Sequence, residues 1–290
     1  MRTAATITLL LITTISAHAG ALRIDSIDVA TDTARVDPIR LAIVGGASAG
    51  AFVVGHVVLN DLWWKGERSD FHVTWTKDWR YALGADKLGH AVMPMIGVDI
   101  YRQAFEWTGM RRRPALWTAG SLAWLYMTYI EVRDGFSAEW GFSWGDMAAN
   151  TLGVGWRVAE EYAPALRHVR WKVSYWPSSV YRAGGYGSIV DDYESTFHWM
   201  SFDPEVLLPA AWREPWPDWL NIAVGHSVEG IGAYDGSGSH AIYLSLDLDT
   251  EGLPGDSSFL RWLKRTLNYY HLPAPAIKVT PDVVWYGLKF

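Results

Sequence analysis

Long apolar runs fill the first half of the chain, and short alternating runs follow in the second half. Four runs have the length of a helix and few interruptions, and they cover residues 41–59, 88–105, 115–130 and 147–158. Short connections between consecutive helices make neighbours antiparallel. The pattern therefore predicts an antiparallel four-helix bundle over residues 38–164.

The period changes after Pro164. We expect an alternating segment over 167–175 and two strands over 220–225 and 241–248, joined by a glycine-rich hairpin loop over 230–238. A helix over 258–270 and a last strand over 283–290 follow. Four prolines between 204 and 217 indicate irregular chain. We expect a mainly α fold in which a smaller C-terminal mixed α/β region, residues 165–290, follows the bundle.

The first residues have the features of a secretory signal peptide. Arg2 precedes a short apolar run over 4–15, and Ala17-His18-Ala19 forms a small-residue cleavage site. We expect residues 1–19 to be removed and residues 20–37 to form an irregular arm. An uncleaved anchor is the weaker alternative, because the run is short for a bilayer. The chain should be exported to a bacterial periplasm or envelope membrane.

Composition favours a protein that meets lipid. Apolar residues make up 50% of the chain and charged residues 19%, and there are 18 Trp and 14 Tyr. Aromatic side chains of this kind collect at lipid headgroups, although an aromatic-rich soluble core is the alternative. The net charge of −6 is diffuse, so nucleic acid is excluded as a partner. The absence of cysteine excludes disulfides and the lipidated thiol of a lipoprotein.

The first apolar run is the strongest candidate for a membrane span. Residues 41–59 contain only His56 as a strongly polar member, and Gly46 and Gly50 form a small-xxx-small step. A small-residue helix buried in a soluble bundle has the same features. The third and fourth runs are short for spanning, and full spanning would place Arg111–Arg113 outside the cytoplasm. A membrane-associated bundle, partly inserted or lying on the surface, is an equal alternative.

Chain direction gathers polar residues at one end of this bundle. The end of the first helix, the start of the second, the end of the third and the start of the fourth must share a side. The polar residues on that side are His56, Asn60, Asp61, Asp86, Lys87, His90, Glu131, Asp134, Asp146 and Asn150. Spacings of three or four residues put two polar residues on one face of each of three helices. The pairs are Asp86 with His90, Glu131 with Asp134, and Asp146 with Asn150. Such pairs resemble the carboxylate sites that are built between helices.

Structural roles compete with functional ones. Asp86 is placed to cap its helix, and Ser143 with Asp146 forms a capping box. A single His90 on an apolar helix is often a hydrogen-bonded core residue. Glu131 and Asp134 are harder to explain in this way, because carboxylates at a helix C-terminus oppose the helix dipole and need a compensating cation.

Two chemistries suit the cluster if it is functional. Asp86, His90, Glu131 and Asp146 could hold a divalent metal such as Ca, Mg, Mn or Zn. Alternatively His90, oriented by Glu131 or Asp134, could act as an acid or base on a lipid-linked phosphate. In that case Lys87 and Asn150 would bind the substrate. No P-loop, nucleophile elbow or zincin helix is present.

Three motifs carry a resemblance to a known family. They are Asp86-Lys-Leu-Gly-His90, Glu131-Val-Arg-Asp134-Gly135, and Gly141-Phe-Ser-Trp-Gly-Asp146 continuing through Asn150 to Gly153. In these motifs the chain resembles the YfiM-like family, domain of unknown function 2279, a group of bacterial envelope proteins often predicted to be lipoproteins. It is more distantly similar to VanZ-like membrane proteins. The resemblance implies an envelope location but no established reaction.

Two functional hypotheses follow from these observations. The first is an envelope protein whose polar bundle end binds a metal or a lipid-linked phosphate, with a membrane lipid or lipid-linked substrate as partner. The second is a non-catalytic envelope scaffold whose polar cluster is structural. In that case its C-terminal strands dock a protein partner or the outer membrane.

Overall fold

The computed structural model describes residues 35–184, 188–206, 208–232 and 236–290. The predicted signal peptide and almost all of the predicted arm lie outside the described residues. The last arm residue, Asp37, accepts hydrogen bonds from the N–H groups of Ile39 and Arg40 and so caps the first helix.

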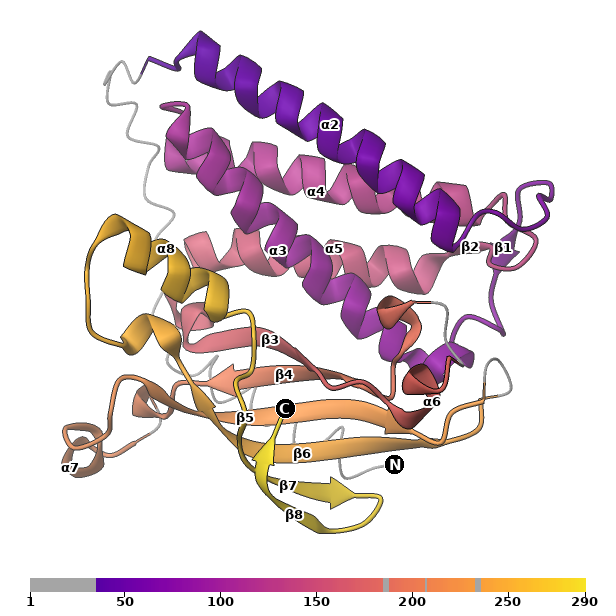
Figure 1. Ribbon diagram of the computed structural model, residues 1–290. Coiled ribbons are helices and arrows are strands. Elements are labelled where there is room, and N and C mark those ends of the chain that lie inside the picture. Colours follow the sequence, from indigo (N-terminus) through magenta and orange to yellow (C-terminus); the bar gives the residue numbers. More distant parts are fainter. Residues whose placement is uncertain (1–34, 185–187, 207, 233–235) are drawn as a thin grey trace.

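The predicted helical segments form α2 (Pro38–Leu62), α3 (Ala85–Trp107), α4 (Arg112–Asp134) and α5 (Trp144–Tyr162). Consecutive helices run antiparallel, so that the end of α4 and the start of α5 lie near the start of α3 (Figure 1). Each is a few residues longer than its apolar run, because caps and polar end residues extend a helix beyond the periodic part. Ser143 caps α5 by accepting a hydrogen bond from the Asp146 N–H, as predicted.

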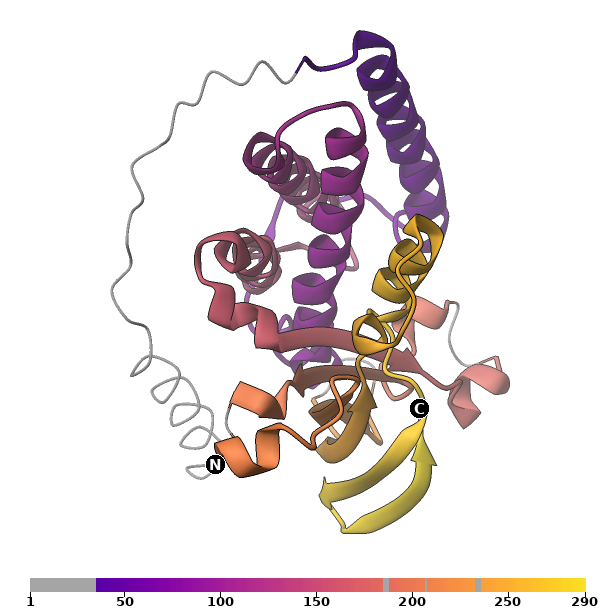
Figure 2. The same cartoon turned by 90° about the vertical axis from the view of Figure 1, so that its left-hand side faces the viewer.

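Three of the four predicted helices make the packed core. Val98, Ala115 and Ala119 are fully buried between α3 and α4, and small side chains of this kind let the helices approach closely. The outer helix α2 buries only Val44 among its described residues and runs along the outside of the bundle (Figures 1 and 2). The apolar surface of α2 is therefore left open.

Six antiparallel strands form one meander sheet in the second half of the chain. In sheet order they are β3 (Val169–Tyr175), β4 (Thr196–Phe202), β5 (Leu220–Glu229), β6 (Ser239–Leu248), β7 (Ala274–Thr280) and β8 (Val284–Lys289). The β5–β6 hairpin was predicted, but β4 and β7 were not. The structure is about 50% helical, so the fold combines a bundle with a full sheet rather than being mainly α with a hairpin.

Shorter elements complete the described chain. The short strands β1 (Val73–Thr74) and β2 (Phe142–Ser143) pair in parallel beside the bundle. The remaining helices are α6 (Ser179–Arg182), α7 (Ala210–Arg213) and α8 (Ser258–Leu267), with 3-10 turns η1 (Tyr81–Gly84), η2 (Pro164–His168), η3 (Ile189–Asp191), η4 (Pro204–Val206) and η5 (Thr250–Gly252). The predicted helix over 258–270 thus ends earlier than expected.

The bundle packs on the sheet at two places. The start of α3 contributes Ala85, which clusters with Ala82 and with Val228 of β5. Toward the other end of the bundle, the rings of Trp156 in α5 and Trp171 in β3 lie 5.7 Å apart. These contacts make an interface between helices and strands that no local sequence pattern predicts.

Candidate functional site

The structure brings the predicted polar residues of three helices into contact at one end of the bundle. Lys87 and His90 come from the first turns of α3, Glu131 from the end of α4, and Asp146 and Asn150 from the start of α5. In Figure 1 this end is the one beside β1 and β2. The juxtaposition follows from the alternating direction of the helices, as the sequence pattern predicts.

Lys87 lies at the centre of three carboxylates. Its Nζ is 2.5 Å from Asp78 Oδ1, 2.9 Å from Asp86 Oδ2 and 2.8 Å from Asp146 Oδ1. All four side chains are buried. Each of the three ammonium protons therefore has a carboxylate within reach. This favours a structural role in which Lys87 holds the three carboxylates in place. Its role as a substrate ligand stays a prediction.

A second group surrounds His90. The Nδ1 atom lies 3.4 Å from Glu131 Oε1 and 3.2 Å from Asn150 Oδ1, and Nε2 lies 3.8 Å from Asp146 Oδ1. One donor atom from each of His90, Glu131 and Asp146 can be chosen so that all three lie within 4.8 Å of one another. Asp146 thus belongs both to this triad and to the carboxylate set around Lys87.

One oxygen of the triad lacks a hydrogen-bond donor. Glu131 Oε1 is buried and accepts no hydrogen bond from any described residue, and the partner of Asp146 Oδ1 is the Lys87 ammonium at 2.8 Å. Glu131 is 1% exposed, and its other oxygen accepts only a long bond of 3.4 Å from the Ser143 N–H. Buried carboxylate oxygens are costly unless protons, donors or cations compensate them. Glu131 Oε1 is therefore available to bind a cation.

Burial sets the protonation of the triad. Burial first, and then the charges of Asp146 and Asp134, raise the pKa of Glu131 to about 10. Burial lowers the pKa of His90, so its imidazole is neutral near pH 7. A neutral imidazole is the form that binds a metal ion.

The residues around Lys87 show a different balance. Burial and the charge of Asp146 raise the pKa of Asp86 to about 7, although Lys87 opposes this shift. Burial alone would lower the pKa of Lys87, but the charges of Asp86 and Asp146 outweigh it and hold this pKa above its usual value. Lys87 is therefore a permanent cation, and the carboxylates around it carry the surplus negative charge.

Two motif glycines allow this close assembly. A Cβ atom at Gly153 would lie 2.0 Å from the backbone oxygen of Ala91, so only glycine lets α5 meet α3 there. A Cβ atom at Gly145 would lie 2.8 Å from Asp78 Oδ2 and 2.9 Å from Lys87 Cε. The glycines in the sequence motif thus mark backbone contacts that hold the polar residues together.

The other predicted residues lie around this centre. Asp134 is half-buried and accepts a hydrogen bond from Trp64 Nε1 at 2.6 Å, and burial raises its pKa to about 7. His56 Nδ1 is 2.6 Å from the Tyr129 hydroxyl. Asn60 accepts a bond from Arg133 Nη2 at 3.4 Å. In this arrangement Trp64, rather than His90, is the hydrogen-bond partner of Asp134. The catalytic role of Asp134 stays a prediction.

Asp61 and Asp78 show where spacing arguments fail. Asp61 pairs with Lys65 on the exposed surface and is not part of the polar centre. Asp78, which the sequence pattern did not single out, is a direct partner of Lys87. Asp78 comes from the connection before η1, and no helical spacing relates it to the helices.

The arrangement defines a carboxylate–imidazole site at the end of a helical bundle. A family model described as "Predicted periplasmic lipoprotein (DUF2279)" matches residues 73–160. This stretch includes every member of the His90 triad and of the Lys87 cluster. Searches of curated proteins and of solved structures found no match.

The family match supports the predicted export to the periplasm or envelope. The 290 residues contain no cysteine, so they offer no thiol for the lipid of a lipoprotein. None of the comparisons supports the similarity to VanZ-like proteins, which stays a prediction.

Proposed function

We propose that this chain is an envelope protein that binds a divalent cation through His90, Glu131 and Asp146. The observation that carries the proposal is the buried Glu131 Oε1, which has no hydrogen-bond donor among the described residues and lies with Asp146 and the imidazole of His90 in one group of potential ligands. A cation bound here would satisfy Glu131 Oε1 and would share Asp146 with Lys87. Because burial raises the pKa of Glu131 to about 10, the cation would bind in place of the Glu131 proton.

The donor set favours zinc or manganese. One imidazole nitrogen with two carboxylate oxygens suits ions that accept nitrogen as well as oxygen, whereas calcium and magnesium prefer oxygen alone. Bonds of about 2.1 Å place two ligands of a tetrahedral ion about 3.4 Å apart. The donor atoms of the triad lie within 4.8 Å of one another, so small side-chain movements would close the site.

Three protein ligands leave a position for water or substrate on a tetrahedral ion. A cation held here would polarise a bound phosphate or carbonyl oxygen. Asn150 Nδ2 is buried and donates no hydrogen bond to any described residue, so it is available to a group bound beside His90. Lys87 would hold Asp146 in place rather than contact the ligand.

We propose further that the site end of the bundle lies at a membrane surface. Among the described residues, α2 is the one helix long and apolar enough to cross a bilayer, and almost none of it is buried. Its last residue lies near the aromatic cluster of Trp63, Trp64 and Trp140. Trp75 and Trp79, in the connection that supplies Asp78, are 69% and 64% exposed. Exposed tryptophans suit the headgroup region of a membrane, where lipid-linked phosphates are found.

Metal analysis of the purified full chain tests the site. We expect stoichiometric zinc or manganese in the wild-type protein and its loss in the Glu131→Gln and His90→Ala variants. The neutral amide of Glu131→Gln resembles the protonated acid that burial favours, so this variant should keep its stability within about 1 kcal/mol. Glu67→Gln, which changes an exposed glutamate outside the triad, is the matched control.

The scaffold hypothesis makes the opposite prediction. If the polar cluster is purely structural, neither ion will bind to chelator-treated protein at millimolar concentration. Metal retained by a folded Glu131→Gln variant would also reject the ligand set proposed here. The ion pairs of Lys87 fit either function and do not decide between them.

A further inference from the structure

A second polar cavity lies near the opposite end of the bundle, between the helices and the sheet. Its volume is about 230 Å³. Six arginines line it, and they are Arg102, Arg112, Arg157, Arg167, Arg170 and Arg265. They come from α3, α4, α5, η2, β3 and α8 in that order. Segments far apart in the sequence thus supply guanidinium groups to one space.

This cavity is separate from the His90 site. Twelve residues of α3 separate His90 from Arg102, a distance of about 18 Å along a helix. No member of the His90 triad lines the cavity. The two sites can therefore be altered independently.

Positive charge exceeds negative charge around the cavity. The lining carboxylates are Asp99, Glu160, Glu161 and Glu251. Six arginines against four carboxylates leave a local charge of +2, whereas the whole chain carries −6. Arginine does not lose its proton in proteins, so this surplus is permanent. A cavity with a fixed positive surplus attracts anions.

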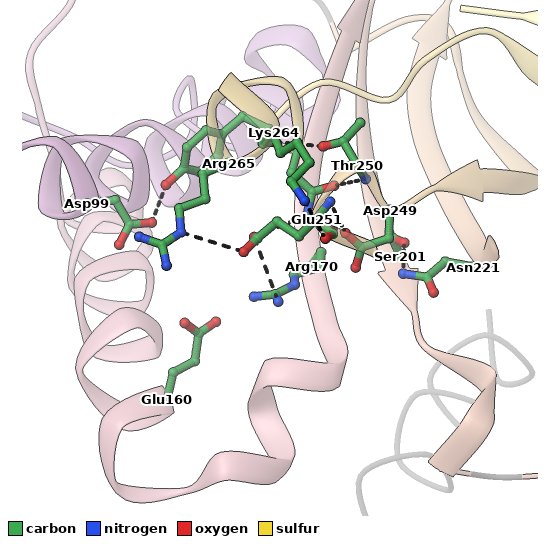
Figure 3. Close-up of polar contacts among 12 residues, drawn as sticks. Asp99, Glu160, Arg170, Ser201, Asn221, Asp249, Thr250, Glu251, Lys264 and Arg265 are labelled. Carbon is green, nitrogen blue, oxygen red and sulfur yellow. Dashed lines mark hydrogen bonds and ion pairs between the residues drawn. The ribbon is translucent and has the colours of Figure 1, made fainter. Parts of the chain in front are cut away.

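Several of the arginines are only loosely paired. Glu251 lies between two of them, with Oε1 3.8 Å from Arg170 and Oε2 3.7 Å from Arg265 (Figure 3). A strong, charge-assisted hydrogen bond between a guanidinium group and a carboxylate is about 2.7–2.9 Å long. Arg157 makes such a bond with Glu160 at 2.9 Å, whereas its Nε lies 3.3 Å from Asp99 Oδ2, a longer ion pair. Arg157 is 8% exposed, so this donor is buried at the cavity wall.

We propose that this cavity binds a phosphate-bearing anion. Several planar guanidinium groups that converge from different directions match the oxygens of a phosphate or diphosphate, which accepts bidentate bonds on more than one side. The loosely held Arg170 and Arg265 would turn from Glu251 to the ligand. The phosphate could belong to a soluble molecule or to a lipid headgroup, and the chemistry of recognition is the same.

Calorimetric titration of the full chain with inorganic pyrophosphate is the direct test. We expect saturable binding that weakens at least about tenfold in the Arg170→Gln/Arg265→Gln double variant, because each lost charge-assisted bond is worth about a factor of ten. Both side chains are partly exposed and loosely paired, so the variant should fold. Arg213→Gln, on α7 and outside the cavity, should bind like the wild type.

Glu251→Gln distinguishes an anion-binding site from a purely structural cluster of ion pairs, because only a binding site would bind pyrophosphate more tightly in this variant. This substitution removes the carboxylate that competes for Arg170 and Arg265, and it raises the local charge from +2 to +3. We expect pyrophosphate to bind about two- to fivefold more tightly, the range for a partly exposed charge pair.

Vesicles distinguish the two sources of phosphate. Flotation with phosphatidylcholine vesicles, with and without phosphatidylglycerol, shows whether the anionic headgroup is bound. Competition by pyrophosphate in the wild type, lost in the double arginine variant, assigns the site to a headgroup. Pyrophosphate binding that leaves flotation unchanged assigns it to a soluble ligand. Absence of saturable pyrophosphate and headgroup binding, or equal binding by all variants, would overturn the proposal.

Discussion

The ion pairs of Lys87 give the sharpest stability prediction. Lys87→Met keeps a long side chain but leaves Asp78, Asp86 and Asp146 buried without their shared cation. Removing one partner of a buried ion pair costs about 3–5 kcal/mol. Unfolding entropy near 2.1 cal/mol/K per residue gives about 0.5 kcal/mol/K for roughly 250 ordered residues, so the melting temperature should fall by about 6–10 °C.

Circular dichroism melts at two pH values measure this effect. The orphaned carboxylates can take up protons, so the loss should be larger at pH 8 than at pH 5.5. Burial already raises the pKa of Asp86 to about 7 with Lys87 present, and removing the cation can only raise it further. The folded variant then binds more protons than its unfolded form, and its stability falls as the pH rises.

A matched surface variant serves as the control. Lys65→Met removes an exposed i, i+4 partner of Asp61, and such pairs contribute at most about 0.5 kcal/mol. The reasoning would be refuted if the free energy of unfolding of Lys87→Met stayed within about 1 kcal/mol of the wild-type value while metal or substrate binding disappeared. Lys87 would then be a functional ligand, as the sequence pattern first indicated.

Three further outcomes follow from the structure. Gly153→Ala should destabilise the bundle by about 2 kcal/mol or more, because the new Cβ would meet the Ala91 carbonyl oxygen. Gly155→Ala has nothing within 4 Å of the new Cβ and should stabilise α5 by about 0.5–1 kcal/mol. Equal urea midpoints for the two variants would contradict this prediction. Metal-free protein should lose stability as pH rises from about 4.5 toward 10, since folded Glu131 keeps a proton that the unfolded chain releases, and a divalent cation or Glu131→Gln should flatten this slope. A slope unchanged in Glu131→Gln would exclude Glu131 as its source. Carbonate should not extract the full chain from envelope membranes if α2 inserts, and complete extraction would exclude a span.

Local patterns predicted the helices well. Apolar runs of helical period depend on neighbouring residues, and the Asp37 and Ser143 caps mark where α2 and α5 begin. Helix direction then placed Glu131 beside His90 without any tertiary information. These inferences needed only connectivity and the geometry of a single helix.

The missed strands show where local patterns end. In β4 both His198 and Trp199 are buried, because the sheet is covered on both faces there, and the alternation that predicts a strand is absent. In β7, Pro275 and the buried Lys278 argue against a strand when only the sequence is read. Pairing with distant strands overrides these local signals.

The sequence by itself predicted export to the periplasm or envelope, and it determined the helical segments and the end of the bundle at which the carboxylates and the imidazole meet. Only the tertiary structure decided that Asp78 completes the cluster around Lys87, that Glu131 keeps an oxygen without a donor, and that six arginines converge on one cavity. The physical reason is distance along the chain. A helix is specified by neighbours a few residues apart, whereas a buried charge and its partners come from segments that meet only when the chain has folded.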